Sequence, residues 1–411
     1  MSGDDRCPSN LRAEQSERGN DVVVHLLLRL LLRLLLTVTP RLHTCTTTMT
    51  AANIPKTHRE YRVTSASKSF DSLQLKEGVE TRTPKADEVL VRMHAVSLNN
   101  RDLQIANGTY PSPFETNIIP VSDGAGEVVA VGEGVKNWKN GDKVMPIFTQ
   151  DLINGQLDDP SLFAGTLGGG CDGVLTEYRT FPAHALVRVP EGYSYEQAAT
   201  LPCAAVTVYN AIFGGNQPLK PGAFVVLQGT GGVSVFGAQL VVAAGANAII
   251  TSSSDDKLKR VSEHIKNSHN HGGAGRLYTI NYKTHPDWDK EVLKITKDGR
   301  GADKVVEIGG AGTLQKSLAC LRQGGEIDDI GYLAGGVSGG VQAVLGGLLS
   351  KAATLRGILV GSRKHLEDLV DFLETGKIHP IIDRTFGFDE AKEAYTYMSK
   401  ATLVGKVVIK V

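Results

Sequence analysis

The chain has few cysteines, no excess of charge of either sign and no long uninterrupted apolar run, and each absence excludes a class of protein. Its five cysteines lie at 7, 45, 171, 203 and 320 of 411 residues, without paired spacing. This pattern argues against a disulfide framework and favours a reducing compartment. Lysine plus arginine equals aspartate plus glutamate, at 44 each, so no general attraction to nucleic acid is indicated. We therefore expect no nucleic-acid partner.

Aromatic residues are also scarce, at 6%, whereas glycine is plentiful, with 46 residues. This composition is typical of an α/β protein that is rich in glycine turns. The length suggests two or three domains.

Residues 1–55 differ from the rest and form a leader that we expect to be disordered or removed. Its apolar stretch at 22–38 is short for a membrane span and contains His25, Arg29 and Arg33, so we expect no span. A basic transit helix would direct the protein to mitochondria, but five acidic residues among the first 21 argue against it. Translation from Met49 is the alternative, and we expect a cytoplasmic protein. The sequence is compatible with translation from Met1 or from Met49, and with a cytoplasmic or a mitochondrial protein.

The stretch 221–254 predicts a dinucleotide site. Ala223–Gln228 is a short apolar run that predicts a buried strand, Phe236–Ala244 has helical apolar spacing, and Ala248–Ser252 predicts a second strand. The glycine-rich turn between the first strand and the helix suits a pyrophosphate, because backbone N–H groups and the helix dipole meet there. The motif is imperfect at its third glycine position. The predicted cofactor residues of the turn are Gly229, Thr230, Gly231, Gly232, Val233 and Ser234.

The end of the second strand indicates NADP(H) rather than NAD(H). An NAD site usually places Asp or Glu about 20 residues after the glycine turn, to bind the ribose 2′-hydroxyl. This chain has Ser252, Ser253 and Ser254 there, followed by Lys257. Hydroxyls and cations would hold a 2′-phosphate, which a carboxylate would repel. Alternatively, the serines only cap the next helix and the basic residues are solvated.

Residues from about 60 to 411 contain a series of further motifs, namely AVSLNNRDL, PVSDGAGEVVAVGEGVKNWKNGDKV, AATLPCAAVTVYNAI, VVLQGTGGVSVFGAQL, TINY, GADKVVEIGG and LVGKVVIKV. These motifs and their order resemble the medium-chain dehydrogenase/reductase superfamily, and most closely its zinc-free branch of quinone oxidoreductase-like and alcohol dehydrogenase-like proteins. The resemblance implies an α/β fold. A GroES-like, barrel-type catalytic domain would span 56–205 and 361–411, with a Rossmann domain of doubly wound parallel sheet at 206–360.

The resemblance also implies that zinc is absent. Zinc members have Cys where this chain has Asn99, a His-Glu pair where it has Ser122-Asp123, and Cys where it has Cys203. One ligand of three cannot hold a catalytic zinc ion. The structural-zinc loop carries four cysteines in zinc members, whereas the corresponding stretch 149–172 contains only Cys171.

Further site residues follow from the resemblance alone. Asn99, Arg101 and Asp123 match positions that line the substrate and nicotinamide cleft, and we predict them to be catalytic, with Asn99 and Arg101 as oxygen-stabilising donors. The alternatives are an ion pair at a helix start for Arg101-Asp102 and a turn cap for Asp123. The predicted cofactor contacts are Thr207 at the nicotinamide and Lys257, Tyr282 and Lys400 at the 2′-phosphate.

Together these features predict a zinc-independent, NADPH-dependent oxidoreductase that transfers hydride between the nicotinamide and a small quinone, enone or other carbonyl compound. Three alternatives stay open: a zinc-free alcohol dehydrogenase or aldehyde reductase, a mitochondrial enoyl-thioester reductase, and a non-catalytic NADPH-binding protein. In the family the segment 335–347 lies near the subunit contact, so we expect a homodimer.

Overall fold

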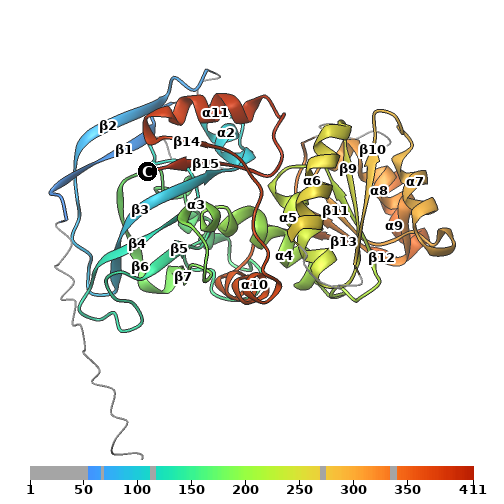
Figure 1. Ribbon diagram of the computed structural model, residues 1–411, viewed down its shortest axis with the longest axis horizontal. Coiled ribbons are helices and arrows are strands. Elements are labelled where there is room, and N and C mark those ends of the chain that lie inside the picture. The colour runs from blue at the N-terminus through green and yellow to red at the C-terminus, as the bar shows by residue number, and fades with distance from the viewer. Residues whose placement is uncertain (1–53, 66–68, 112–116, 269–274, 334–339) are drawn as a thin grey trace, which may run out of the picture. The chain divides into compact units, whose positions relative to one another are not determined.

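The structure, a computed structural model, describes residues 54–65, 69–111, 117–268, 275–333 and 340–411. Residues 1–53 of the predicted leader and 335–339 of the predicted subunit contact lie outside the described residues. Across the described ranges, no helix has both the length and the apolar character that crossing a membrane requires. The chain forms one large parallel sheet and one large mixed sheet (Figure 1).

The parallel sheet has the strand order β10-β9-β8-β11-β12-β13. In this order the chain winds outwards from the central strand β8 in both directions, as in dinucleotide-binding sheets. Its strands are β8 (Phe224–Gln228), β9 (Asn247–Ser252), β10 (Arg276–Asn281), β11 (Ala302–Glu307), β12 (Leu321–Asp329) and β13 (Thr354–Gly357). The helices of this region are α4 (Val206–Phe213), α5 (Gly232–Ala243), α6 (Asp255–Ser268), α7 (Trp288–Ile295), α8 (Leu314–Cys320) and α9 (Gly340–Lys351).

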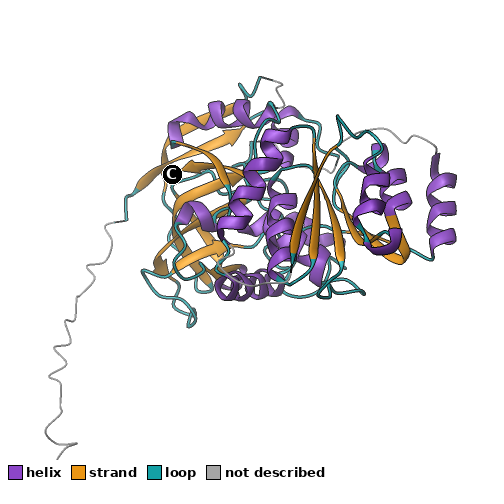
Figure 2. Ribbon diagram, turned by 45° about the vertical axis from the view of Figure 1, so that its right-hand side comes forward, coloured by secondary structure: helices purple, strands orange, loops and turns teal. Residues whose placement is uncertain are grey.

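Helices cover both faces of this sheet (Figure 2), so its central strand is buried on both sides. Val225, Val226 and Leu227 of β8 are fully buried, which explains the continuous apolar run in the sequence. The strands and the helix predicted after Pro221 are confirmed to within a few residues.

The mixed sheet takes its strands from both ends of the described chain. Its order is β14-β15-β3-β4-β5-β7, and β6 also pairs with β3. Its strands are β3 (Glu88–Leu98), β4 (Asp123–Val131), β5 (Lys143–Pro146), β6 (Tyr178–Pro182), β7 (Leu186–Arg188), β14 (Ile382–Phe386) and β15 (Lys406–Lys410). The strands β1 (Thr57–Val63) and β2 (Leu73–Glu80) form a separate antiparallel pair. The predicted α/β class is confirmed, whereas the domain boundaries at 205/206 and 360/361 stay predictions.

The helices associated with the mixed sheet are short, except for one near the C-terminus. They are α2 (Asn100–Asn107), α3 (Tyr195–Ala198), α10 (Arg363–Gly376) and α11 (Ala391–Ser399). Short 3-10 helices occur at Pro160–Gly165, Ala183–Ala185, Lys297–Gly299, Gly310–Gly312 and Phe388–Glu390, and a π-helical turn spans Leu201–Ala205.

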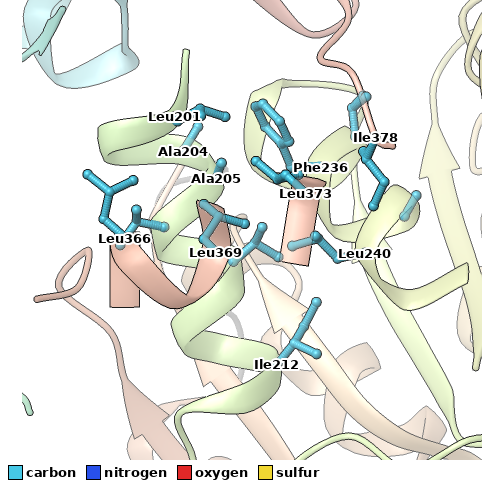
Figure 3. Packing of buried hydrophobic residues seen from close by; sticks show 14 of the residues in the cluster. Leu201, Ala204, Ala205, Ile212, Phe236, Leu240, Leu366, Leu369, Leu373 and Ile378 are labelled. Atoms are coloured by element: carbon cyan, nitrogen blue, oxygen red, sulfur yellow. The ribbon is translucent and has the colours of Figure 1, made fainter. Parts of the chain in front are cut away.

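Helix α10 packs on the elements that lead into the parallel sheet. Leu366, Leu369 and Leu373 recur at helical spacing on α10, and all three are buried. Figure 3 shows them in one cluster with Ile212 of α4 and Leu240 of α5. These side chains belong to one buried cluster that also includes Met145 and Val187 of the mixed sheet. A shared core therefore connects the two sheets.

Buried charges occur in β11 and β12, and they are paired. The Lys304 ammonium lies 2.8 Å from Glu326 Oε1 and 3.2 Å from Asp328 Oδ2. Arg356 of β13 contacts Asp328 at 3.3 Å and also donates a 2.6 Å hydrogen bond to Asn210 Oδ1 of α4. The network thus connects the far half of the parallel sheet to the helix that precedes it.

The start of β15 contacts the glycine turn directly. The Gly405 N–H donates to Thr230 O at 2.9 Å, and Gly405 forms a parallel bridge with Gly231. Gly405 has a φ of +84°, and a Cβ at this position would lie 2.2 Å from Ile381 O. Only glycine can therefore bring the last strand to the turn.

We predict that Gly405→Ala lowers the free energy of unfolding by at least about 3 kcal/mol, because a left-handed backbone and a backbone clash add up. Gly222 is the matched control, since its φ is +78° and a Cβ at this position would meet nothing within 4 Å. Gly222→Ala should cost only about 1 kcal/mol. Urea unfolding measures both, and equal losses would contradict the assigned clash.

Candidate active site

The glycine turn leaves the amino end of α5 open. Gly229 has a φ of +75°, and at Gly229 and Gly231 a Cβ would meet nothing within 4 Å. Gly231 is the N-cap of α5, and no side chain caps this end of the helix. Backbone N–H groups at such an end need an acceptor, and a pyrophosphate supplies oxygens to them. The turn therefore has the geometry of a phosphate site.

Ser234 and Gly237 explain the imperfect glycine motif. Ser234 is fully buried and donates its hydroxyl hydrogen bond to Gln228 O, so it braces the turn from within. The close approach of helix to strand occurs three residues later, at Gly237. A Cβ there would lie 2.5 Å from Leu227 Cδ2. The turn thus keeps its shape without a glycine at 234.

The end of β9 brings together the residues that were predicted to hold a 2′-phosphate. The Tyr282 N–H donates to Ser252 O at 2.9 Å. The Lys257 ammonium donates to Ala401 O at 3.0 Å, which places it beside Lys400 at the end of α11. Ser253 and Lys400 are exposed. Residues from β9, α6, β10 and α11 therefore meet at one edge of the parallel sheet.

The predicted substrate end of the site is centred on Asn99, the residue that precedes α2. Asp102 Oδ2 accepts a 2.7 Å hydrogen bond from the Asn99 N–H and thereby caps the helix. Lys406, the first residue of β15, donates to Asn99 Oδ1 at 2.5 Å and to Leu98 O at 2.8 Å. Its ammonium also lies 3.4 Å from Asp123 Oδ2. The structure therefore brings Asn99 and Asp123 together around a lysine.

Burial determines the ionisation of the acidic groups here. It raises the pKa of the fully buried Asp123, although the Lys406 charge opposes the shift. It also raises the pKa of Asp102 to about 6, although Arg101 and the Asn99 N–H favour the carboxylate. Burial and the Asp123 charge together raise the pKa of the Cys203 thiol, so Cys203 stays a thiol at neutral pH.

Arg101 is held by its own contacts rather than aimed at Asn99. Its Nη1 donates to Leu167 O at 2.8 Å, and its guanidinium lies 4.7 Å from the Phe148 ring centroid and 5.3 Å from that of Tyr110. Its Nη1 is also 3.8 Å from Asp102 Oδ1, so the ion pair given above as the alternative is present. A catalytic role for Arg101 stays a prediction.

Thr207 lies on α4, just after the π-helical turn that contains Cys203. Its hydroxyl donates to Cys203 O at 2.7 Å, and its side chain is almost completely buried. The hydroxyl therefore secures the turn that carries Cys203. Its predicted contact with the nicotinamide stays a prediction.

Lys406 is the residue that sequence reasoning missed. Its side chain is 3% exposed, and its stem packs on the glycine turn, since a Cβ at Gly232 would lie 2.6 Å from Lys406 Cδ. A signal was available in the closing stretch LVGKVVIKV, where a lysine opens an otherwise apolar run. A buried cation of this kind requires partners, and the partners lie some 300 positions earlier in the chain.

Comparisons with known proteins agree with this architecture. Residues 85–191 match the model of the alcohol dehydrogenase GroES-like domain, and 274–409 match that of the zinc-binding dehydrogenase domain. A zinc-type alcohol dehydrogenase-like protein of Schizosaccharomyces pombe is 42% identical over 344 residues, which is 83% of this chain and 96% of the relative. The GroES-like prediction is thus confirmed.

Solved structures resemble the chain over most of its length. A Sinorhizobium meliloti protein assigned as an alcohol dehydrogenase has a TM-score of 0.77 and 35% identity, and the match covers 87% of this chain and all of that one. A quinone oxidoreductase of Pseudomonas syringae has a TM-score of 0.68 and 26% identity, with 86% of this chain and all of the other covered.

The donor atoms around Asn99 do not fit the zinc ion that some of these names imply. Asn99 Oδ1 and Asp123 Oδ2 face the Lys406 ammonium, which repels a second cation. A catalytic zinc ion needs three protein ligands. Among the residues that the structure describes, no three His, Cys, Asp or Glu side chains are grouped so as to hold a metal.

We predict that Asp102 makes stability fall as pH rises from about 4 to 6. A carboxyl whose pKa is higher in the folded than in the unfolded chain favours folding at low pH, and this contribution is lost as pH rises through the folded value. Relative to wild type, Asp102→Asn should therefore gain about 2 kcal/mol of unfolding free energy between pH 4.5 and pH 7.

The exposed Asp158, changed to Asn, is the control, and its stability curve should run parallel to that of wild type. Urea titrations of the three proteins at both pH values measure the effect. A curve for Asp102→Asn that is parallel to wild type would contradict the raised pKa.

Proposed function

Because the chain belongs to the medium-chain dehydrogenase/reductase superfamily, we propose that it is a zinc-independent, NADPH-dependent oxidoreductase that reduces a small quinone or enone. The single observation that carries this proposal is the buried Lys406 ammonium beside Asn99 and Asp123, in the place where zinc members have metal ligands. An enone or quinone is already an activated acceptor of hydride. Its reduction therefore needs hydrogen-bond donors rather than a metal ion.

The proposed cofactor site extends from the glycine turn to the end of β9. The open amino end of α5 would bind the pyrophosphate. Ser252, Ser253, Lys257, Tyr282 and Lys400 would hold the 2′-phosphate, and Thr207 would lie at the nicotinamide. Bound NADPH would supply the hydride. In support of NADPH over NADH, the residues at the end of β9 carry hydroxyls, and the first carboxylates that follow in the chain, Asp255 and Asp256, are exposed in the first turn of α6.

Asn99 is the proposed donor to the oxygen of the acceptor. Its Nδ2 is buried and has no hydrogen-bond partner, although the amide is near enough to Asp123 to favour the carboxylate. Negative charge develops on the oxygen of an enone or quinone as hydride arrives at carbon. A fixed donor at this place would stabilise that charge. Arg101 would contribute positive charge nearby, and Asp123 would help to keep the Asn99 side chain in place.

A homodimer is proposed from the outer edge of the parallel sheet. β13 ends the sheet, and α9 beside it presents Val341, Leu345 and Leu349 to solvent with exposed fractions of 69%, 54% and 84%. A second copy of the chain would bury this stripe and pair with the strand edge. The compartment proposed is the cytoplasm.

The test of the proposed function is a scan of acceptors with the full chain, with and without a chelator. We expect quinones or enones to oxidise NADPH at a rate that the chelator does not change. Loss of activity with the chelator would contradict zinc independence, and a preference for NADH would contradict the cofactor assignment. Reduction of aldehydes alone would favour an aldehyde reductase. Tight NADPH binding without turnover of any acceptor would favour a binding protein.

We predict that Lys257→Ala weakens NADPH binding about 10-fold and leaves NADH binding unchanged, because only NADPH carries the phosphate that the ammonium would meet. Lys259, on the same helix, points to solvent and pairs with Glu263 at 3.9 Å. Lys259→Ala is therefore the control and should leave both affinities unchanged. Nucleotide fluorescence titrations measure them, and an equal loss for NADPH and NADH would refute the 2′-phosphate contact.

A further inference from the structure

We propose that Lys406 is a positioning residue, which orients the Asn99 amide so that Nδ2 is presented to the oxygen of the acceptor. The inference rests on the proposed function, because it gives Asn99 an acceptor to bind. The inference adds Lys406, from β15, to the residues of the proposed site. It assigns to this buried lysine the role of fixing the orientation of the neutral Asn99 amide.

All N–H bonds of the Lys406 ammonium are directed to oxygen atoms of the protein, so none remains for a substrate. A lysine ammonium has three N–H bonds. Three oxygen atoms surround this one: Leu98 O at 2.8 Å, Asn99 Oδ1 at 2.5 Å and Asp123 Oδ2 at 3.4 Å. The side chain is also almost completely buried. Lys406 therefore acts through its neighbours rather than as a proton donor to the substrate.

The ammonium determines which way the Asn99 amide faces. A lysine donates only, so it must meet the oxygen and not the nitrogen of the amide. With Oδ1 held at 2.5 Å, Nδ2 is directed away from the lysine, and this nitrogen is buried without a partner. An unpaired buried donor is unfavourable. A ligand oxygen that accepts a hydrogen bond from Nδ2 would pair this nitrogen. This orientation of the Asn99 amide therefore favours the binding of such a ligand.

The lysine also balances the charge of Asp123. Asp123 is fully buried, and Lys406 is the cation that contacts it directly. Without the ammonium this carboxylate would be left uncompensated, and the Asn99 amide, which already favours the Asp123 carboxylate, would lose the contact that fixes its oxygen. The two roles can be separated, because Asp123→Asn removes the need for charge balance but does not restore the anchor of Asn99.

The test is a mutant cycle in the full chain. Lys406→Met keeps a straight side chain about as long as the apolar stem of lysine and removes the ammonium. We expect kcat for the best acceptor of the scan to fall about 10- to 100-fold, with little change in the Kd for NADPH. We expect the kcat of Asn99→Ala to fall by a similar factor. The double variant should be no slower than Asn99→Ala, because the lysine acts through the asparagine.

Two further variants exclude a merely structural effect. Lys406→Met with Asp123→Asn should recover the thermal stability that Lys406→Met loses, but its kcat should stay below that of Asp123→Asn alone. Lys410→Met, in the same strand but exposed and paired with Glu196, should change neither stability nor kcat. Losses that multiply in the double variant with Asn99→Ala would overturn the proposal. A kcat for the Lys406→Met, Asp123→Asn double variant equal to that of Asp123→Asn alone would also overturn it, because Lys406 would then serve only as a counter-charge.

A readout without turnover keeps the inference testable if no acceptor is reduced. In protein labelled with ¹⁵N-asparagine, the Asn99 side-chain NH₂ signal is identified by its loss in Asn99→Ala. We expect two distinct, exchange-protected protons in wild type and averaged or rapidly exchanging ones in Lys406→Met. An unchanged signal in Lys406→Met would refute the positioning role. Absence of turnover with a changed signal would refute only the proposed function.

Discussion

The site depends on the hydrogen bonds made by two neighbouring residues, Gly405, which precedes β15, and Lys406, the first residue of β15. Gly405 attaches the last strand to the glycine turn, and Lys406 attaches it to Asn99 at the end of β3. The glycine turn, which we propose to bind the cofactor, and Asn99, which we propose as the donor to the substrate, are thereby joined through Gly405 and Lys406. A displacement of these two residues would move both parts of the proposed site together.

Electrostatic balance in the interior explains why this segment needs a lysine rather than an apolar residue. Four charged side chains surround Asn99, namely Arg101, Asp102, Asp123 and Lys406, and all are buried. Two are positive and two are negative, so the cluster is neutral, and each carboxylate has a cation within 4 Å. Buried charge is tolerated when it is paired in this way. The same principle is seen in the network around Lys304, far from the glycine turn in the parallel sheet.

Much of the fold could be predicted because it is encoded locally. The apolar run at 223–228, the glycine turn and the following helical spacing each specify their own element, and the structure places β8 and α5 there. The neighbourhood of Lys257 and Lys400 was reached only through the family resemblance, since nothing local in the sequence joins α6 to the end of α11. Lys406 was missed for a related reason: its partners are determined by the pairing of β15 with β3, and a one-dimensional pattern does not encode that pairing.

The position of β15 in the sheet has a consequence for the order of folding. β15 (residues 406–410) lies between β14 and β3, and it pairs with residues of β3 that precede it by some 300 positions. Such non-local pairings form slowly, because a long loop must close before the strands meet. Within the parallel sheet, by contrast, β8 pairs with β9 through residues such as Phe224 and Asn247, which are close in sequence. Asn99 therefore gains its anchor in a slow, long-range step of folding.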